Sequence, residues 1–234
     1  MNASVDFPIA EIARLKSALP LNDQIHQKLR WNLASGVYKP EQRLSTRALA
    51  GEFGTSVMPV REALKRLVAE RILVVEPNSA FRVPKISRAR GVQLFEIRKT
   101  LEMLATRHAI PNLTRAHIDL LRKVDNDTNE AIRRGDSHGY FAANYSFHFL
   151  IYSAANNIDL SAIIEGLWMQ IGPFFASILE MNSFRDGWQI YHSDIIEAVR
   201  SGNADEAALA IARDIDSAKA YFAAATDEPI DHAL

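Results

Sequence analysis

Four polar side chains stand at positions where a metal ion could bind. Asn144 and His148 are four residues apart, which in a helix places them one turn apart on the same side. His192 precedes an apolar stripe by one turn, and Asp214 lies within another such stripe. Buried polar groups need partners. Two imidazoles, a carboxylate and an amide oxygen from three helices can satisfy one another through a divalent cation, and zinc, nickel and manganese suit this set equally. The alternative is a set of ordinary core residues with hydrogen bonds.

Arg98 is a second polar residue on an apolar helix face, which it shares with Leu94, Leu101 and Ala105. One interpretation is an ion pair with Glu102, four residues later on the same helix. The other is a guanidinium placed in a pocket, where it can bind a carboxylate through two parallel hydrogen bonds. The spacing alone leaves both interpretations open.

A third chemistry is indicated between residues 45 and 83. Ser45 is suited to cap a short helix that ends at Gly54, and Ser56 is suited to cap the next helix, with Pro59 in its first turn. The segments 72–76 and 81–83 favour β-strands around a turn at 77–79. Helix, short helix, tight turn, helix and hairpin is the order of a winged helix-turn-helix.

In that motif the first residues of the second helix reach base edges in the major groove. We therefore expect Arg61 to face the groove, opposite the apolar stripe of its helix. Arg47 could contact a phosphate or a base, Lys65 the DNA backbone, and the hairpin tip the minor groove or a phosphate. The residues predicted to contact double-stranded DNA are Arg47, Ser56, Met58, Arg61, Lys65 and Asn78.

The elements around these residues predict a mainly α protein. A helix is expected over 21–34, after an N-terminal arm at 1–20 that is partly helical near 11–19. Beyond residue 86, helices are expected near 88–109, 114–134, 136–155, 158–181, 184–201 and 203–224. This pattern favours a winged helix-turn-helix at 21–85, an antiparallel bundle of six or seven helices at 86–226, and a tail at 227–234.

Composition narrows the class of protein. The 234 residues include no cysteine, which excludes disulfides and thiolate metal sites and suits the cytoplasm. No apolar run approaches the roughly 18 residues of a membrane span, so no membrane contact is expected. Residues 1–85 hold 13 Lys and Arg against 8 Asp and Glu, whereas residues 86–234 hold 14 against 20. This asymmetry suits a DNA-binding region joined to a domain that does not touch DNA.

The first region resembles the GntR family of bacterial regulators. The resemblance is carried by Gly36-Val37-Tyr38-Lys39-Pro40, Arg43-Leu44-Ser45, Leu49-Ala50 and Phe53 through Leu67, with Pro59-Val60-Arg61-Glu62-Ala63-Leu64 at its centre. The family usually has Arg where Val57 stands, often Glu at Thr46, and Gly at Ala80. The resemblance therefore implies a conserved frame with an altered operator preference.

The region 91–222 resembles the ligand-binding domain of the FadR-type branch, on Arg98, Leu101-Glu102, Phe147-His148, His192, Ile195-Ile196 and Ala198. Many members of that branch bind a metal through an Asp and a His one turn apart and two later His. Asn144 here replaces that Asp, and Asp214 replaces the last His. The resemblance implies that Arg98 and the metal bind a small organic acid.

Three functions follow from these residues. The first is a dimeric regulator, in our expectation a repressor released by a small carboxylate bound beside a metal. The second is a regulator that senses the metal itself. The third, a metal-dependent hydrolytic enzyme that activates water, lacks a separate general base near the proposed ligands, and we expect no enzyme.

Overall fold

The computed structural model describes residues 20–77, 80–182 and 191–225. The predicted arm before Pro20, Asn78 and the predicted tail lie outside the described residues. Two compact units divide the chain. One contains residues up to Trp31 together with Gln42–Val83, and the other contains Asn32–Glu41 together with the chain from Pro84 onward.

The first unit has the predicted order of helices. Helix α2 (Leu21–Ala34) begins in it, followed by α3 (Thr46–Glu52) and α4 (Val57–Ala69). Ser45 caps α3 as predicted, because its hydroxyl accepts a hydrogen bond from the backbone N–H of Ala48 at 3.3 Å. Ser56 occupies the N-cap position of α4 but makes no capping hydrogen bond with its side chain. That part of the prediction is therefore wrong.

A three-stranded sheet completes the wing. It consists of β1 (Arg43–Leu44), β2 (Val74–Val75) and β3 (Phe81–Arg82), in the order β1-β3-β2. Strand β3 pairs antiparallel with both neighbours, with Phe81 opposite Leu44 on one side and Val75 on the other. The sequence predicted the β2–β3 hairpin but not β1, because β1 has no partner strand across a short turn and pairs only with the distant β3.

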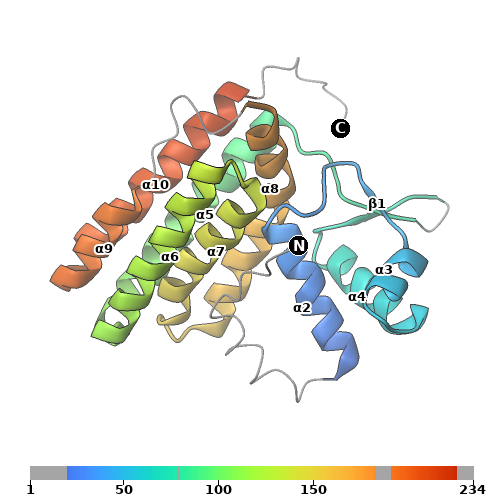
Figure 1. The fold of residues 1–234 in the computed structure, drawn as a ribbon, viewed down its shortest axis with the longest axis horizontal. Coiled ribbons are helices and arrows are strands. Elements are labelled where there is room, and N and C mark those ends of the chain that lie inside the picture. The colour runs from blue at the N-terminus through green and yellow to red at the C-terminus, as the bar shows by residue number, and fades with distance from the viewer. Residues whose placement is uncertain (1–19, 78–79, 183–190, 226–234) are drawn as a thin grey trace. The chain divides into compact units, whose positions relative to one another are not determined.

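The second unit is a bundle of helices (Figure 1). In the described residues it has six α-helices and one 3-10 helix: α5 (Arg88–Ala109), η1 (Ile110–Asn112), α6 (Arg115–Arg134), α7 (Ser137–Ser153), α8 (Ile158–Asn182), α9 (His192–Ser201) and α10 (Ala204–Ala225). The predicted helix at 184–201 begins at His192, since Tyr191 is not helical. The residues 183–190 lie outside the described part. No helix in the described ranges is long and apolar enough to cross a membrane.

Helices α5 and α10 pack along each other, as do α6 and α7. Small buried residues on α10, such as Ala207 and Ala210, allow close approach. On α5, Gly91 leaves room for Phe222, because an added Cβ would lie 2.2 Å from a Phe222 ring carbon. This packing fixes α5, which carries Arg98, against α10, which carries Asp214.

Candidate functional site

The exposed side of α4 carries several of the residues predicted to contact DNA. The helix is oriented by Val60, Leu64 and Leu67, which are fully buried. Arg61 projects on the exposed side, and Arg47 is exposed on α3. Neither guanidinium has a hydrogen-bond or ion-pair partner among the described residues, so both are available to phosphates or bases.

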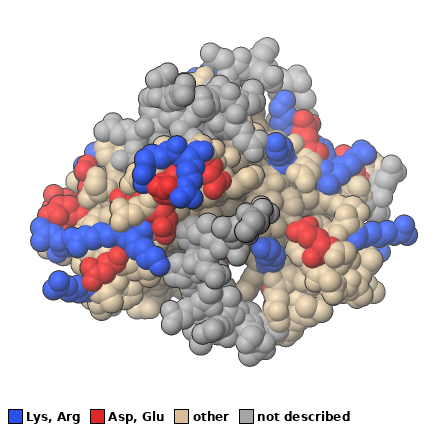
Figure 2. Space-filling view, in the orientation of Figure 1, with Lys and Arg blue, Asp and Glu red and all other residues tan. Residues whose placement is uncertain are grey.

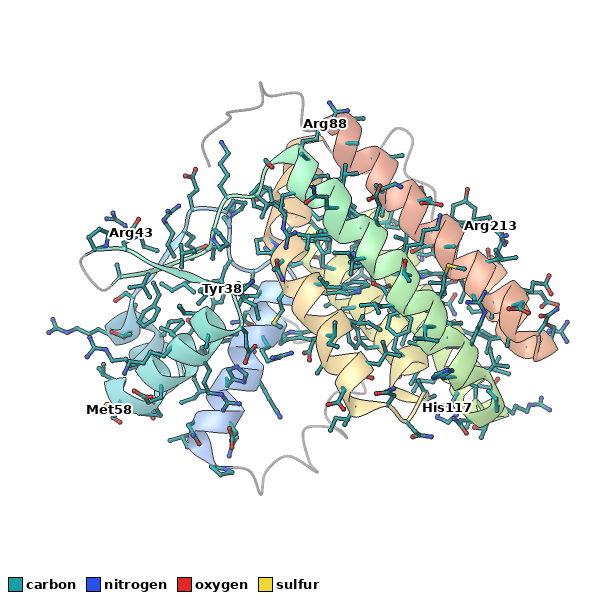
Figure 3. All side chains as sticks on the ribbon, turned by 180° about the vertical axis from the view of Figure 1, so that it is seen from behind. Tyr38, Arg43, Met58, Arg88, His117 and Arg213 are labelled. Atoms are coloured by element: carbon teal, nitrogen blue, oxygen red, sulfur yellow. The ribbon has the colours of Figure 1, made fainter. Side chains whose placement is uncertain are left out.

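Two other predicted contacts are also exposed. Lys65 forms an ion pair with Glu62 at 2.9 Å, so its charge is partly neutralised in the free protein. Met58 is 67% exposed and projects at the outer edge of its unit (Figure 3). Basic and acidic side chains are interspersed over the face drawn in Figure 2, so the basic excess does not form one continuous patch there.

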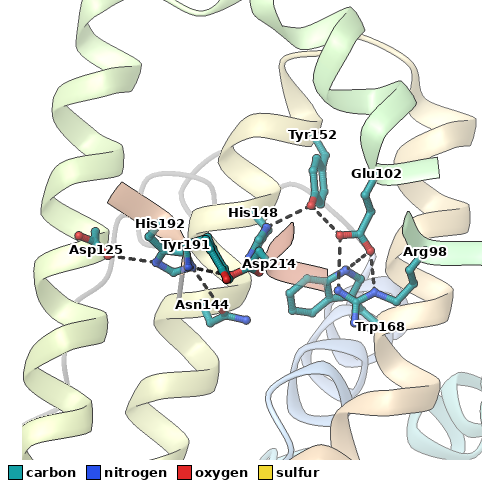
Figure 4. A network of polar contacts seen from close by, with 10 residues as sticks. All are labelled: Arg98, Glu102, Asp125, Asn144, His148, Tyr152, Trp168, Tyr191, His192 and Asp214. Carbon is teal, nitrogen blue, oxygen red and sulfur yellow. Dashed lines mark hydrogen bonds and ion pairs between the residues drawn. The ribbon is translucent and has the colours of Figure 1, made fainter. Parts of the chain in front are cut away.

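A buried carboxylate, Glu102, lies towards one end of the polar network in the second unit and joins three of its donors (Figure 4). It accepts hydrogen bonds from Arg98 Nε at 2.6 Å, Trp168 Nε1 at 2.9 Å and the Tyr152 hydroxyl at 2.6 Å. The Arg98 guanidinium also stacks on Trp168, 4.0 Å from the ring centroid. The structure therefore contains the Arg98–Glu102 ion pair that the spacing allowed.

Arg98 nevertheless keeps donor capacity. Its bonds to Glu102 use Nε and Nη2, and within the described part of the chain no partner is found for Nη1. The side chain lines a cavity of about 30 Å³ together with Asn144, His148, Asp214 and apolar residues of α5, α7, α8 and α10. A space of this size admits a few waters or a small ion.

The four predicted metal ligands lie next to one another in two pairs (Figure 4). His148 Nε2 is 3.3 Å from Asp214 Oδ2. His192 Nε2 is 3.1 Å from Asn144 Oδ1. Both imidazoles are 1% exposed. No group of three or more His, Cys, Asp or Glu side chains in the described ranges is arranged as a metal site as it stands.

The other nitrogen of each imidazole is already engaged. His192 Nδ1 is 3.1 Å from a carboxylate oxygen of Asp125, and His148 Nδ1 is 3.1 Å from the Tyr152 hydroxyl. Since Tyr152 donates its proton to Glu102, its oxygen is left to accept from His148. Nδ1 of each ring can therefore donate, to Asp125 or to the Tyr152 oxygen, and each Nε2 faces an oxygen of Asp214 or Asn144.

Burial and neighbouring charges shift three pKa values in this network. Burial, followed by the Glu102 carboxylate, raises the pKa of Tyr152 well above its ordinary value, so its hydroxyl stays protonated. Burial lowers the pKa of His192 and keeps this ring neutral at pH 7. For Asp214, burial acts to raise the pKa, but the hydrogen bond with His148 and the positive charges that His148 and His192 carry when protonated outweigh it and lower the pKa.

Acid should therefore destabilise the helical unit. The pKa of His192 in the folded chain lies below its ordinary value of 6.5, so the unfolded chain binds more protons below that pH. Stability present above pH 6.5 is lost as the pH falls, and Asp214 adds an effect of the same sign below 3.8. We expect the thermal midpoint of chelator-treated protein to fall between about pH 7 and pH 5.5. The thermal midpoint of His192→Asn should change less with pH. A midpoint of the unaltered protein that stays constant over this pH range would contradict this account.

The structure brings together every predicted ligand of the helical unit, and it adds residues that the sequence did not single out. Asp125 on α6 contacts His192, and Tyr152 and Trp168 contact Glu102. Asp125 had a signal that could have found it, because it follows the buried Leu121 by one turn.

Comparison with known proteins agrees with both units. Residues 21–83 match the family of bacterial regulatory proteins called gntR, and residues 93–217 match the FCD domain family. The chain is 36% identical over 150 residues to the HTH-type transcriptional regulator McbR of Escherichia coli K12. The matched region covers 64% of this chain and 68% of McbR. It is 30% identical over 166 residues to a probable D-xylose utilization operon transcriptional repressor of Paenarthrobacter nicotinovorans, covering 70% of this chain and 71% of that protein.

The solved structure of E. coli McbR/YncC superimposes with a TM-score of 0.81 at 28% identity, over 87% of this chain and 97% of that one. The fold and the site thus define a DNA-binding transcriptional regulator with a winged helix-turn-helix and a helical C-terminal domain. The chain belongs to the GntR family, and its C-terminal domain is an FCD domain.

Proposed function

We propose that this regulator responds to a small carboxylate bound beside a divalent metal in its FCD domain. The observation that carries the proposal is the pair of buried imidazoles whose Nε2 atoms lie 3.3 Å and 3.1 Å from oxygens of Asp214 and Asn144. A divalent cation between these nitrogens and oxygens would be bound by all four groups.

The residues present fit a metal in their donor chemistry. Imidazole nitrogens and carboxylate oxygens are the ordinary ligands of zinc, nickel and manganese, and Asn144 would add a weaker amide oxygen. Asp125 and Tyr152 would hold the two imidazoles in the tautomer that leaves Nε2 free, as outer partners of metal-bound histidines commonly do. When bound, the ion would supply a positive charge to which a carboxylate can coordinate.

Arg98 would supply the second contact for the acid. Arg98 lines the cavity, while Glu102 and Trp168 hold its guanidinium in place. We propose that the acid changes the placement of two DNA-binding units in a homodimer and releases the operator. Half-sites would then lie about one DNA turn apart. Such a protein acts where the DNA is, in the cytoplasm.

Metal binding can be tested on the purified full chain. After chelator treatment, titration with Zn²⁺, Ni²⁺ or Mn²⁺ should show about one ion per chain by calorimetry, with a raised unfolding midpoint. The double variant His148→Ala/His192→Ala should lose this binding. His108→Ala, on an exposed position of α5, is the matched control. Equal binding by the double variant and the control would overturn the metal site.

The acid response has a separate test. With acetate as the first probe, operator affinity of the metal-loaded protein should fall by about 5- to 150-fold, the usual range for coupled sites. Arg98→Lys, which keeps a positive charge beside Glu102 but cannot bind a carboxylate through two parallel hydrogen bonds, should bind the operator normally but lose most of the response. Arg107→Gln, also on α5, should keep the response. If the metal alone changes operator affinity and acids do not, the ion itself is the signal.

A further inference from the structure

The first turn of α4 exposes apolar side chains where DNA readers usually place polar ones. Val57 is 40% exposed and Met58 is 67% exposed. They are the first two residues of the helix after the N-cap residue Ser56. A single exposed apolar residue has no special meaning. Here, however, two adjacent ones stand at the end of the helix that a helix-turn-helix directs at base edges.

The neighbours of Met58 define what this end of the helix can recognise. Met58, Arg61 and Lys65 lie on the side of α4 away from the buried Val60 and Leu67. Lys65 is paired with Glu62. The surface therefore presents one apolar side chain next to one guanidinium that has no partner among the described residues.

These two side chains match two different groups in the major groove. An arginine is suited to guanine, through the acceptors O6 and N7. An apolar side chain is suited to the C5-methyl group of thymine, the apolar group that a base edge presents in that groove. We propose that Met58, flanked by Val57, reads the methyl group of a thymine next to the guanine that Arg61 contacts.

The expected size of the effect follows from the burial of one methyl group. Removing it should cost about 0.8 kcal/mol, which is about fourfold in affinity. If the operator has two half-sites, removing both methyl groups should cost about 15-fold. The effect of the Met58–methyl contact on operator affinity should therefore be measurable but smaller than that of a charged side chain that contacts a base.

The test begins with an operator selected from random duplexes by the purified protein. Each thymine is then replaced by deoxyuridine, which keeps the hydrogen-bonding groups and lacks only the methyl. We expect one thymine per half-site, beside a guanine, whose replacement weakens binding about fourfold. Met58→Ala should bind both forms equally, at the level of the unaltered protein on uracil DNA.

Two further variants keep the outcome interpretable. Met58→Leu retains an apolar side chain and should still prefer thymine over uracil, while Lys123→Ala on α6 should behave as the unaltered protein. Specific binding in which no thymine matters by more than twofold, or a uracil effect that persists in Met58→Ala, would overturn the proposal. Absence of any specific binding would instead argue against DNA recognition as a whole.

Discussion

Replacing Arg61 with alanine is expected to reduce operator affinity by about 5- to 150-fold for each half-site that the protein reads. Arg61 is exposed on α4, opposite the fully buried Val60 and Leu64 that anchor the helix. Because it has no partner within the described ranges, binding DNA breaks no existing ion pair. Fluorescence anisotropy with a selected operator and with scrambled DNA measures both the loss of affinity and the loss of specificity.

The variant Lys65→Ala tests a phosphate contact, in contrast to the base contact expected of Arg61. Lys65 is held by Glu62 and is expected to contact phosphate, so its removal should weaken operator and scrambled DNA alike and lower the salt dependence of binding by about one ion. Arg61→Lys should keep the charge and lose specificity, because lysine cannot form the bidentate pair. Equal discrimination between operator and scrambled DNA in Arg61→Ala and the unaltered protein would show that Arg61 does not read bases.

Replacing Glu102 with alanine is expected to lower the free energy of unfolding by about 3–5 kcal/mol. Glu102 is 0% exposed and satisfies Arg98, Trp168 and Tyr152 at once. Its loss leaves the buried guanidinium of Arg98 without a counter-charge and two other donors without an acceptor. Urea unfolding followed by circular dichroism measures the change.

Two comparisons separate this effect from a general sensitivity to lost charge. Glu197→Ala removes an exposed ion-pair partner of Arg200 and should leave the unfolding midpoint unchanged. The double variant Arg98→Met/Glu102→Leu should recover much of the lost stability, since apolar replacement of a buried pair costs far less than removal of one partner. A Glu102→Ala protein as stable as the unaltered protein would show that Glu102 does not hold the network together.

The sequence by itself determined the features that depend on near neighbours in the chain. Apolar periodicity, the turn at Gly54 and the cap at Ser45 define the helix-turn-helix, because these signals act over one or two turns. In the same way, the spacing of Asn144 and His148 placed them together on α7. The Arg98–Glu102 pair was one of the two interpretations that the spacing allowed.

Only the tertiary structure decided which groups meet across the bundle. Trp168 contacts Glu102 from 66 positions away, and Asp125 contacts His192 from 67. No local pattern encodes such contacts, since they depend on how the helices pack and rotate against one another. The same applies to β1, which becomes a strand only because β3 lies beside it. The four candidate ligands were thus predictable as candidates, whereas the bonds that orient their side chains depend on the packing of α5, α6, α7, α8 and α9.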